Sequence, residues 1–415
     1  MPTAGAHPDD DDARRQLHRM AAAAGLDVRG GRLLRTSSRF CLGVEHGDYN
    51  GTELFGVGTD RFLWSLSRPN ALGRVRLFSG AFPDEGRAEF APGQVPTALA
   101  PELAGRWARF PCGVDHVLRR AGHPQRQGID VVLHSTIPGG GMSRSASLCL
   151  NLLLVFAAAN GRRIEDRLRL CELAREVEND YVGSPCGLLD QVMIAFARAG
   201  AGTHYRPADR SVVHVAIGER APDFRFVALD TGTVRPGLEQ STYAVRRREC
   251  AQLLAMLAPE FGLRALADLR DEALHERIQR RLRPAHARLG DRLRYLFEAQ
   301  QRFLRMLIAW RAGDIAEVGA LFRADGAGLR DLYAISGPEL EAMCSVARTV
   351  PGVFGERMLG GGDKGAAGAL VAAHAVPALR AAVAAGYPRL CPAQAQTFAV
   401  HECRLVDGIV ELPSG

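Results

Sequence analysis

The sequence predicts an α+β fold, and two observations lead to this prediction. Strand-like and helical segments mix along the chain without the regular strand–helix–strand spacing that builds a doubly wound parallel sheet. The chain has 415 residues, 47% of them hydrophobic and 24% charged, which is typical of a globular protein with two or three domains. We place a domain boundary near residue 215, between domains at 16–215 and 216–415.

The chain begins with a short acidic segment. Residues 1–15 contain small residues, proline and the run Asp9 to Asp12, so we expect a solvated, disordered tail. A metal-binding role for the aspartates is the less favoured alternative.

The first half then alternates strands and helices. Aromatic and branched residues predict strands at 39–44 and 54–67. A buried strand at 129–134 runs through three glycines into a helix at 145–159. Further helices are expected at 164–181 and 187–197.

The second half opens with a predicted strand at 224–229. Helices are expected at 241–257, 291–311, 315–324 and 337–350. A glycine-rich turn at 358–368 is expected to lead into an alanine-rich helix, and the last strands are placed at 397–405 and 409–412.

Composition and charge argue against several classes of function. The net charge is +6, but the basic residues are spread through helices rather than arranged in a stripe, so no nucleic-acid partner is expected. No apolar run approaches the roughly 20 residues that cross a bilayer, and no signal-like pattern opens the chain, so no membrane role is expected. Nine scattered cysteines without zinc spacing indicate reduced thiols in the cytoplasm.

The loop at 137–148, IPGGGMSRSASL, is a candidate phosphate site. Gly139, Gly140 and Gly141 allow close backbone approach to an anion, and a helix N-terminus follows. Ser143 and Ser145 add hydroxyls, and a serine oxygen can ligate Mg²⁺. The alternative is a glycine turn with a serine cap. The loop lacks the Gly-Lys-Ser/Thr ending of a P-loop.

Two further segments carry carboxylates. SRFCLGVEHGDYNG, at 38–51, gathers Glu45, His46 and Asp48, which suit recognition of several hydroxyls; the alternative is a polar turn. ENDYVGSPCGLLDQ, at 178–191, places Asp190 one turn into an apolar helix, where it could also be a simple N-terminal helix charge.

The glycine-rich segment MLGGGDKGAAG, at 358–368, fits the dinucleotide pattern only weakly. No acidic residue follows near the required position, and a flexible turn is the simpler interpretation. It carries Lys364, the single lysine of the chain. A lone lysine among arginines can serve as a compact point charge, or it can be a solvated loop residue.

Taken together and in this order, the segments resemble the galactokinase branch of the GHMP kinases. SRFCLGVEHGDYNG is similar to the family's sugar motif and IPGGGMSRSASL to its phosphate loop. YVGSPCGLLDQ is similar to its catalytic segment, LDTGTVRPGLEQSTYAVRRREC to its YxxRRxEC helix, and ERMLGGGDKGAAGALV to its third motif. The resemblance runs from about residue 30 to the C-terminus. It implies a two-domain fold with the active site in the cleft between the domains.

The resemblance also implies an activity. The family transfers phosphate from ATP, with Mg²⁺, to a sugar hydroxyl, here expected to be the anomeric hydroxyl of galactose or a related sugar. A monomer or homodimer in the cytoplasm is expected.

The resemblance further implies roles for single residues. Asp190 would accept the proton of the attacking hydroxyl, and Arg39 would lie against it and stabilise charge on the phosphoryl group. The remaining matches are to sugar-binding residues (Glu45, His46, Asp48, Gly187, Tyr243), to ATP-binding residues (Gly139, Gly140, Gly141, Ser143, Arg144, Ser145, Lys364) and to Mg²⁺ ligands (Ser145, Glu178).

Some positions depart from the family pattern. The phosphate-loop proline lies one position nearer the serines, Arg144 replaces the middle serine, and Val44 replaces the glycine before Glu45. Asp363 and Lys364 replace Phe-Gly in the last motif. The two added cations leave a cyclitol or an already phosphorylated acceptor open as alternatives. A catalytically silent sugar sensor is the alternative from another class, and retention of Asp190 and Arg39 argues against it.

Overall fold

Two β-sheets organise the computed structural model, which describes residues 7–234 and 241–413. The first sheet has eight strands in the order β12-β1-β2-β5-β3-β4, with β6 joined to β2 and β7 to β6. Its strands are β1 (Arg32–Gly43), β2 (Leu54–Asn70), β3 (Val75–Ser79), β4 (Ala88–Phe90), β5 (Gly128–Ser135), β6 (Ala201–Arg206), β7 (Ser211–Ala216) and β12 (Ile409–Leu412).

The second sheet is antiparallel, with the order β11-β8-β10-β9. Its strands are β8 (Phe224–Asp230), β9 (Val353–Met358), β10 (Ala366–Ala372) and β11 (Ala399–Cys403). The helices are α1 (Asp9–Ala23), α2 (Arg109–Arg120), α3 (Arg144–Ala159), α4 (Arg167–Glu176), α5 (Leu189–Ala195), α6 (Thr242–Phe261), α7 (Glu272–Ala312), α8 (Ile315–Asp331), α9 (Pro338–Arg348) and α10 (Val376–Leu390).

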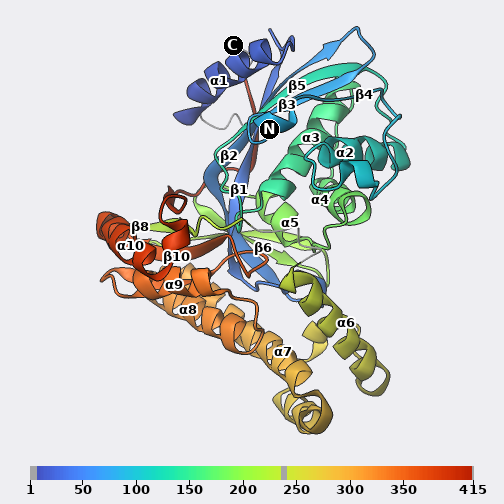
Figure 1. Cartoon of the computed structure of the whole chain (residues 1–415). Coiled ribbons are helices and arrows are strands. Elements are labelled where there is room, and N and C mark those ends of the chain that lie inside the picture. The colour runs from blue at the N-terminus through green and yellow to red at the C-terminus, as the bar shows by residue number, and fades with distance from the viewer. Residues whose placement is uncertain (1–6, 235–240, 414–415) are drawn as a thin grey trace.

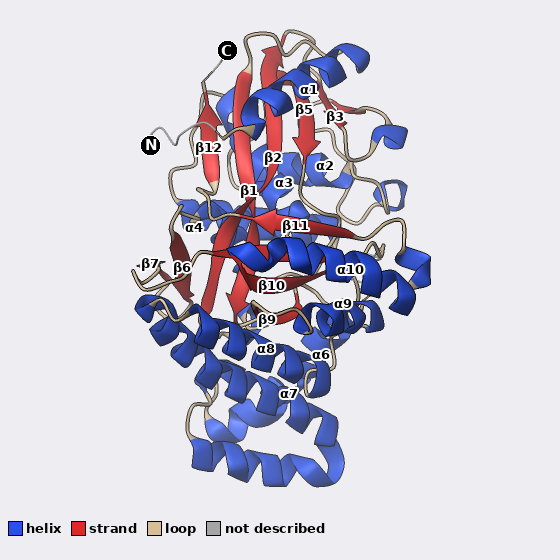
Figure 2. Ribbon diagram, turned by 90° about the vertical axis from the view of Figure 1, so that its left-hand side faces the viewer, coloured by secondary structure: helices blue, strands red, loops and turns tan. Residues whose placement is uncertain are grey.

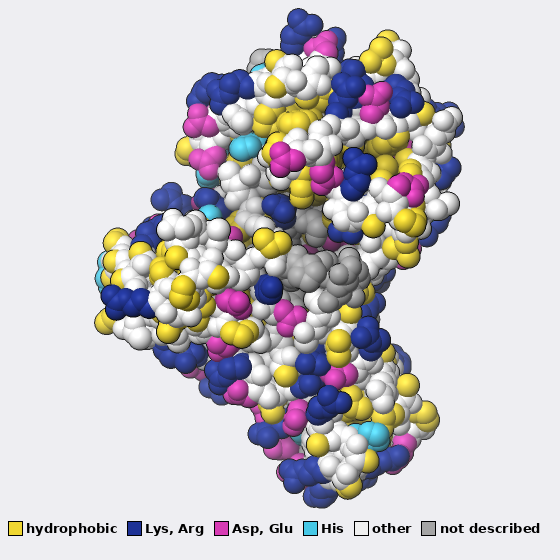
Figure 3. Space-filling model, in the orientation of Figure 1, with side chains coloured by type: hydrophobic (Ala, Val, Ile, Leu, Met, Phe, Trp, Pro, Cys, Tyr) yellow, Lys and Arg dark blue, Asp and Glu magenta, His cyan; other side chains and the backbone are white. Residues whose placement is uncertain are grey.

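Helices cover both sheets. In Figure 1, α2 to α5 lie on one side of the first sheet and α1 on the other, while α8, α9 and α10 accompany the second sheet. Helices α6 and α7 project from the lower end in both views (Figure 2). On the face shown in Figure 3, acidic and basic side chains are interspersed.

One hydrophobic core connects the two sheets. The Phe40 ring, on β1, lies 4.8 Å from the Phe226 ring on β8 and 5.5 Å from the Phe322 ring on α8, measured between centroids. Because side chains alternate along a strand, the neighbouring Arg39 points to the opposite side of β1. It meets α5 there, and this position begins the site described below.

The prediction of a disordered tail over residues 1–15 is wrong for the part that the structure describes. Residues Asp9 to Asp12 form the first turn of α1, where acidic side chains suit the helix dipole. Asp10 is buried, and it pairs with Arg35 at 2.6 Å and accepts a hydrogen bond from Trp64 Nε1 at 2.8 Å. These partners on the first sheet order the acidic segment. Residues 1–6 lie outside the described residues.

The predicted alanine-rich helix does not follow the glycine turn directly: it is α10, which begins only at Val376. Residues 366–372 form β10, the strand between β8 and β9. Every residue of β10 is buried, and a Cβ on Gly368 would lie 2.4 Å from the Phe40 ring. Gly368 allows this close packing, and pairing with two strands overrides the helix propensity of the alanines.

Most other elements lie where they were predicted. The expected helix at 164–181 becomes α4 followed by a π-helical turn at Val177–Val182, and the helix expected at 291–311 is the second part of the 41-residue α7. The boundary predicted near 215 falls at the end of β7, and β12 returns from the second half of the chain to pair with β1. The division into domains stays a prediction. Across the described ranges, no helix has the length and apolarity needed to span a membrane.

Candidate active site

A cavity of about 570 Å³ collects the residues that the sequence singled out. It is lined by the segment after β1, the glycine loop before α3, the π-helical turn, α5, α6 and the loop after β9. All the predicted site residues except Lys364 line it: Arg39, Glu45, His46, Asp48, Gly139, Gly140, Gly141, Ser143, Arg144, Ser145, Glu178, Gly187, Asp190 and Tyr243.

Arg39 and Asp190 form an ion pair at this cavity. Arg39 donates through Nε to Asp190 Oδ1 at 2.8 Å, and its Nη2 lies 2.7 Å from the same oxygen; Nη1 donates to the carbonyl of Gly141 at 2.8 Å. The Arg39 side chain is buried, whereas 29% of the Asp190 side chain remains exposed. Burial alone would lower the pKa of Arg39, but the carboxylates of Asp190 and Glu45 outweigh it and raise that pKa. Asp190 therefore presents a carboxylate to the cavity beside a fixed positive charge.

Glu45 is held from the second sheet. Arg357, fully buried on β9, donates to Glu45 Oε2 at 2.8 Å and lies 3.4 Å from Asp325 Oδ2. The hydroxyl of Tyr295 donates to the Glu45 carbonyl at 3.0 Å. A segment after β1 is thus fixed by residues about 250 to 310 positions further along the chain.

His46 and Asp48 complete the segment after β1. Nδ1 of His46 lies 3.0 Å from the Tyr49 hydroxyl, and its ring centroid lies 5.2 Å from that of Tyr243. Burial raises the pKa of Asp48 to about 6, and the Asp190 carboxylate adds to that rise. Asp48 Oδ2 accepts from the backbone N–H of Leu189 at 3.3 Å.

The two glycine-rich loops touch through their backbones. A Cβ on Gly140 would lie 2.8 Å from the Gly365 Cα, so neither loop could keep this approach with a larger residue. At the same loop, the Ser143 hydroxyl is buried with no hydrogen-bond partner among the described residues. An unsatisfied donor beside glycines that line the cavity suits a phosphate oxygen.

Arg144 also belongs to this loop. Burial lowers the pKa of its guanidinium, while Asp230 opposes the shift. The guanidinium carbon lies 5.4 Å from the centroid of the Phe82 ring. Arg144, which stands where the family pattern has a serine, thus puts a partly desolvated cation on the cavity wall.

Ser145 and Glu178 have the chemistry of a magnesium site. The Ser145 side chain hydrogen-bonds to the Glu178 carboxylate, and Gln191 Nε2 donates to Glu178 Oε2 at 2.7 Å. Burial raises the pKa of Glu178 to about 7, against the effect of the Ser145 hydrogen bond. Hydroxyl and carboxylate oxygens are the hard ligands that Mg²⁺ prefers, so the residues present fit the ion.

Lys364 is the one predicted site residue that does not line the cavity, although the next residue, Gly365, touches Gly140. The sequence interpretation missed Arg357, which lies inside the quoted segment ERMLGGGDKGAAGALV but received no role. Its signal was an arginine directly before the glycine-rich turn. Residues 235–240, within the quoted segment 229–250, lie outside the described residues.

Comparison with known proteins identifies similar chains. Residues 109–198 match the family described as GHMP kinases N terminal domain. The chain is 33% identical over 360 residues to a galactokinase of Chloroflexus aurantiacus, covering 86% of this chain and 88% of the relative. It is 31% identical over 380 residues to one of Roseiflexus, covering 91% and 92%.

The fold comparison agrees. Galactokinase of Lactococcus lactis, solved in complex with galactose, superposes with a TM-score of 0.87 at 27% identity, covering 97% of this chain and all of that one. A mevalonate kinase of Methanococcus jannaschii superposes with a TM-score of 0.62 at 14% identity, covering 91% and 98%, and shares the fold.

Proposed function

Because the chain belongs to the galactokinase family of the GHMP kinases, we propose that it transfers the γ-phosphate of ATP to the anomeric hydroxyl of galactose. The ion pair of Arg39 and Asp190, at a cavity lined by both the glycine loop and the segment after β1, is the observation that carries this proposal. Phosphoryl transfer depends mainly on positioning and electrostatic stabilisation, and this cavity supplies both.

Asp190 is the proposed general base. Its partly exposed carboxylate can accept the proton of the sugar hydroxyl as the oxygen attacks phosphorus. Arg39 holds the carboxylate in place and stabilises charge on the transferring group. The sugar is proposed to be oriented by hydrogen bonds from the remaining wall of the cavity (Glu45, His46, Asp48, Gly187, Tyr243).

The nucleotide is proposed to bind at the glycine loop before α3. Backbone N–H groups of that loop and the unpaired Ser143 hydroxyl would receive its phosphates. Ser145 and Glu178 would hold Mg²⁺, which when bound neutralises phosphate charge. A cytoplasmic location, where ATP is supplied, belongs to the same proposal; all nine cysteines are unpaired.

A second candidate is a kinase for an acceptor that already carries a phosphate. Arg144 favours it, because a partly desolvated guanidinium on the cavity wall is a ready partner for a phosphate dianion.

The test is ATP consumption against galactose, related sugars, cyclitols and their phosphates. Galactose should be the best acceptor, and phosphorus NMR should place the new phosphate on the anomeric oxygen. A phosphorylated acceptor preferred by tenfold or more would replace the galactose proposal with the second candidate. If the protein binds galactose but consumes no ATP with any acceptor, the result would indicate a catalytically silent sugar sensor.

A further inference from the structure

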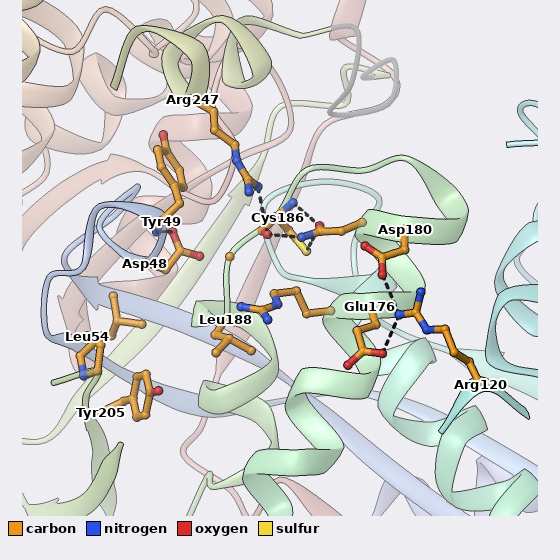
Figure 4. A pocket seen from close by; sticks show the side chains of 14 residues that line it. Asp48, Tyr49, Leu54, Arg120, Glu176, Asp180, Cys186, Leu188, Tyr205 and Arg247 are labelled. Carbon is orange, nitrogen blue, oxygen red and sulfur yellow. Dashed lines mark hydrogen bonds and ion pairs between the residues drawn. The ribbon is translucent and has the colours of Figure 1, made fainter. Parts of the chain in front are cut away.

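A second cavity, of about 750 Å³, borders the segment after β1. It shares Asp48, Cys186 and Gly187 with the candidate active site, but its other walls come from α2, α4, β6 and α6. Figure 4 shows Arg247 reaching toward Cys186 on one side and Arg120 toward Glu176 and Asp180 on another. We call this space the rear cavity.

Three arginines line the rear cavity, and they differ in how they are paired. Arg120 donates to Glu176 and Asp180, at 2.8 and 2.7 Å, so two carboxylates balance its charge. The side chain of Arg175, partly buried on α4, has no ion pair or hydrogen bond to any residue in 7–234 or 241–413. Arg247 donates to the Cys186 carbonyl at 3.2 Å, and its guanidinium carbon lies 5.8 Å from the centroid of the Tyr49 ring.

Two guanidiniums on this wall therefore have no carboxylate partner within the part of the chain that the structure describes. Tyr205 also lines the cavity. Burial raises the pKa of its phenol, and Arg175 is one of the groups that oppose this rise, so the charge of Arg175 is felt at the Tyr205 wall. Planar guanidiniums match the oxygens of a phosphate group in charge and geometry.

We propose that the rear cavity binds a phosphate monoester or inorganic phosphate dianion through Arg175 and Arg247. The site is separate from the glycine loop, because neither arginine lines the candidate active site. A regulatory effect of this site on the enzyme rests on the proposed function, because the product of that reaction is itself a phosphate monoester.

The rear cavity is connected to acceptor binding through residues 186–189. Arg247 holds the carbonyl of Cys186, and the next residue, Gly187, packs so closely on Asp48 that a Cβ would lie 2.1 Å from Oδ2. A phosphate that draws Arg247 away from Cys186 loosens this packing. Looser packing at Asp48 weakens sugar binding. Because coupling between two ligands is reciprocal, the sugar then weakens phosphate binding by the same factor.

Calorimetric titration with inorganic phosphate tests the site. Arg175→Gln should lose one phosphate site, with affinity at least tenfold weaker, since charge-assisted hydrogen bonds are removed. Phosphate that stays bound in this variant belongs to the glycine loop. Arg248→Gln changes an exposed arginine of α6 outside the cavity wall, so it should bind as the parent does. Parent-like binding by Arg175→Gln overturns the proposal.

Two more measurements identify which phosphate compound binds the rear cavity and how its binding affects galactose. Galactose 1-phosphate that binds the rear cavity more tightly than inorganic phosphate identifies the product as the ligand, and the reverse order identifies free phosphate. Phosphate should raise the KM for galactose in the parent and in Arg248→Gln but not in Arg175→Gln. If galactose is not a substrate, the proposed function fails, while the calorimetric difference still decides the site. Arg175→Lys, which keeps the charge, should retain part of the affinity and so exclude misfolding as the cause.

Discussion

At the scale of single residues, the division of labour between Arg39 and Asp190 follows from their unequal burial. Arg39 is enclosed and uses its donors on Asp190 and on the Gly141 carbonyl, so its position is fixed before any substrate binds. Asp190 keeps 29% of its side chain exposed and can still accept a hydrogen bond from another donor. A rigid cation and an accessible carboxylate are the arrangement that proton abstraction beside a phosphate requires.

Asp190→Asn should lower kcat by on the order of 10²-fold or more, because the amide keeps the shape but cannot take the proton. Galactose binding should be largely retained. Steady-state kinetics with galactose and ATP measure both quantities, and Asp331→Asn, at an exposed aspartate of α8, serves as the control. A kcat within about twofold of the parent, far below a general base's usual share, would show that Asp190 is not the base.

Asp48 gives a prediction about pH. Its pKa is raised to about 6, so the carboxylate is charged above that pH and becomes protonated below it. The galactose dissociation constant, measured without nucleotide, should therefore increase by up to about tenfold between pH 7 and pH 5, as a charge-assisted hydrogen bond is replaced by a neutral one. Asp48→Asn should bind weakly at every pH and lose this dependence. A parent profile that is flat over the range contradicts the role of Asp48.

At the scale of elements, two loops that lie far apart in the sequence meet without side chains between them. The loop before α3 and the loop between β9 and β10 approach through Gly140 and Gly365. The loop before α3 carries the unpaired Ser143 hydroxyl, and the loop between the strands β9 and β10 carries Gly360 and Gly361 into the same cavity. The spacing of the two loops therefore sets the width of the proposed phosphate site.

Gly140→Ala should separate these loops, because its Cβ would lie 2.8 Å from the Gly365 Cα. A displacement of this kind is expected to reduce kcat/KM for ATP by about 10- to 100-fold. Gly139→Ala, in the same loop, would bring its Cβ within 4 Å of no protein atom, so any loss that it shows comes from the approach of the nucleotide and should be smaller than the loss in Gly140→Ala. Equal kinetics for the two variants would show that contact between the loops does not shape the ATP site.

At the scale of the whole molecule, buried charges link the second sheet to the segment after β1. Arg357 on β9 binds Glu45 and approaches Asp325 on α8, and all three side chains are at least 95% buried. Such a cluster is costly to desolvate, and each member depends on the others for compensation. The cluster holds Glu45, a proposed sugar-binding residue, in a fixed position relative to the second sheet.

Arg357→Met should lower the free energy of unfolding by about 3–5 kcal/mol, because it leaves buried carboxylates uncompensated. The double variant Arg357→Met/Glu45→Gln should recover part of this loss. Arg348→Met removes the ion pair of a half-exposed arginine to Glu356 on β9, and the buried Glu356 keeps Arg323 as its partner, so the cost should stay below about 1 kcal/mol. Urea unfolding measures all three. Equal costs for the two single variants would show that the buried cluster contributes no special stability.

The sequence by itself determined what depends on neighbours along the chain. Alternating and branched residues marked β1, β2 and β5, and glycines followed by hydroxyls marked the loop that leads into α3. The same local patterns supported the resemblance to galactokinases, and nearly all residues chosen from them line one cavity. Local order is readable because backbone geometry and side-chain periodicity are set within a few residues.

Only the tertiary structure decided which polar groups are buried together. It ordered the acidic N-terminal segment, because Asp10 meets Arg35 and Trp64 in the first sheet. It made 366–372 a strand, because this segment pairs with both β8 and β9 and packs Gly368 against the Phe40 ring. It also brought Arg357 to Glu45, 312 positions away in sequence. The free energy of a buried charge depends on partners that the chain supplies from any distance, and no local pattern contains that information.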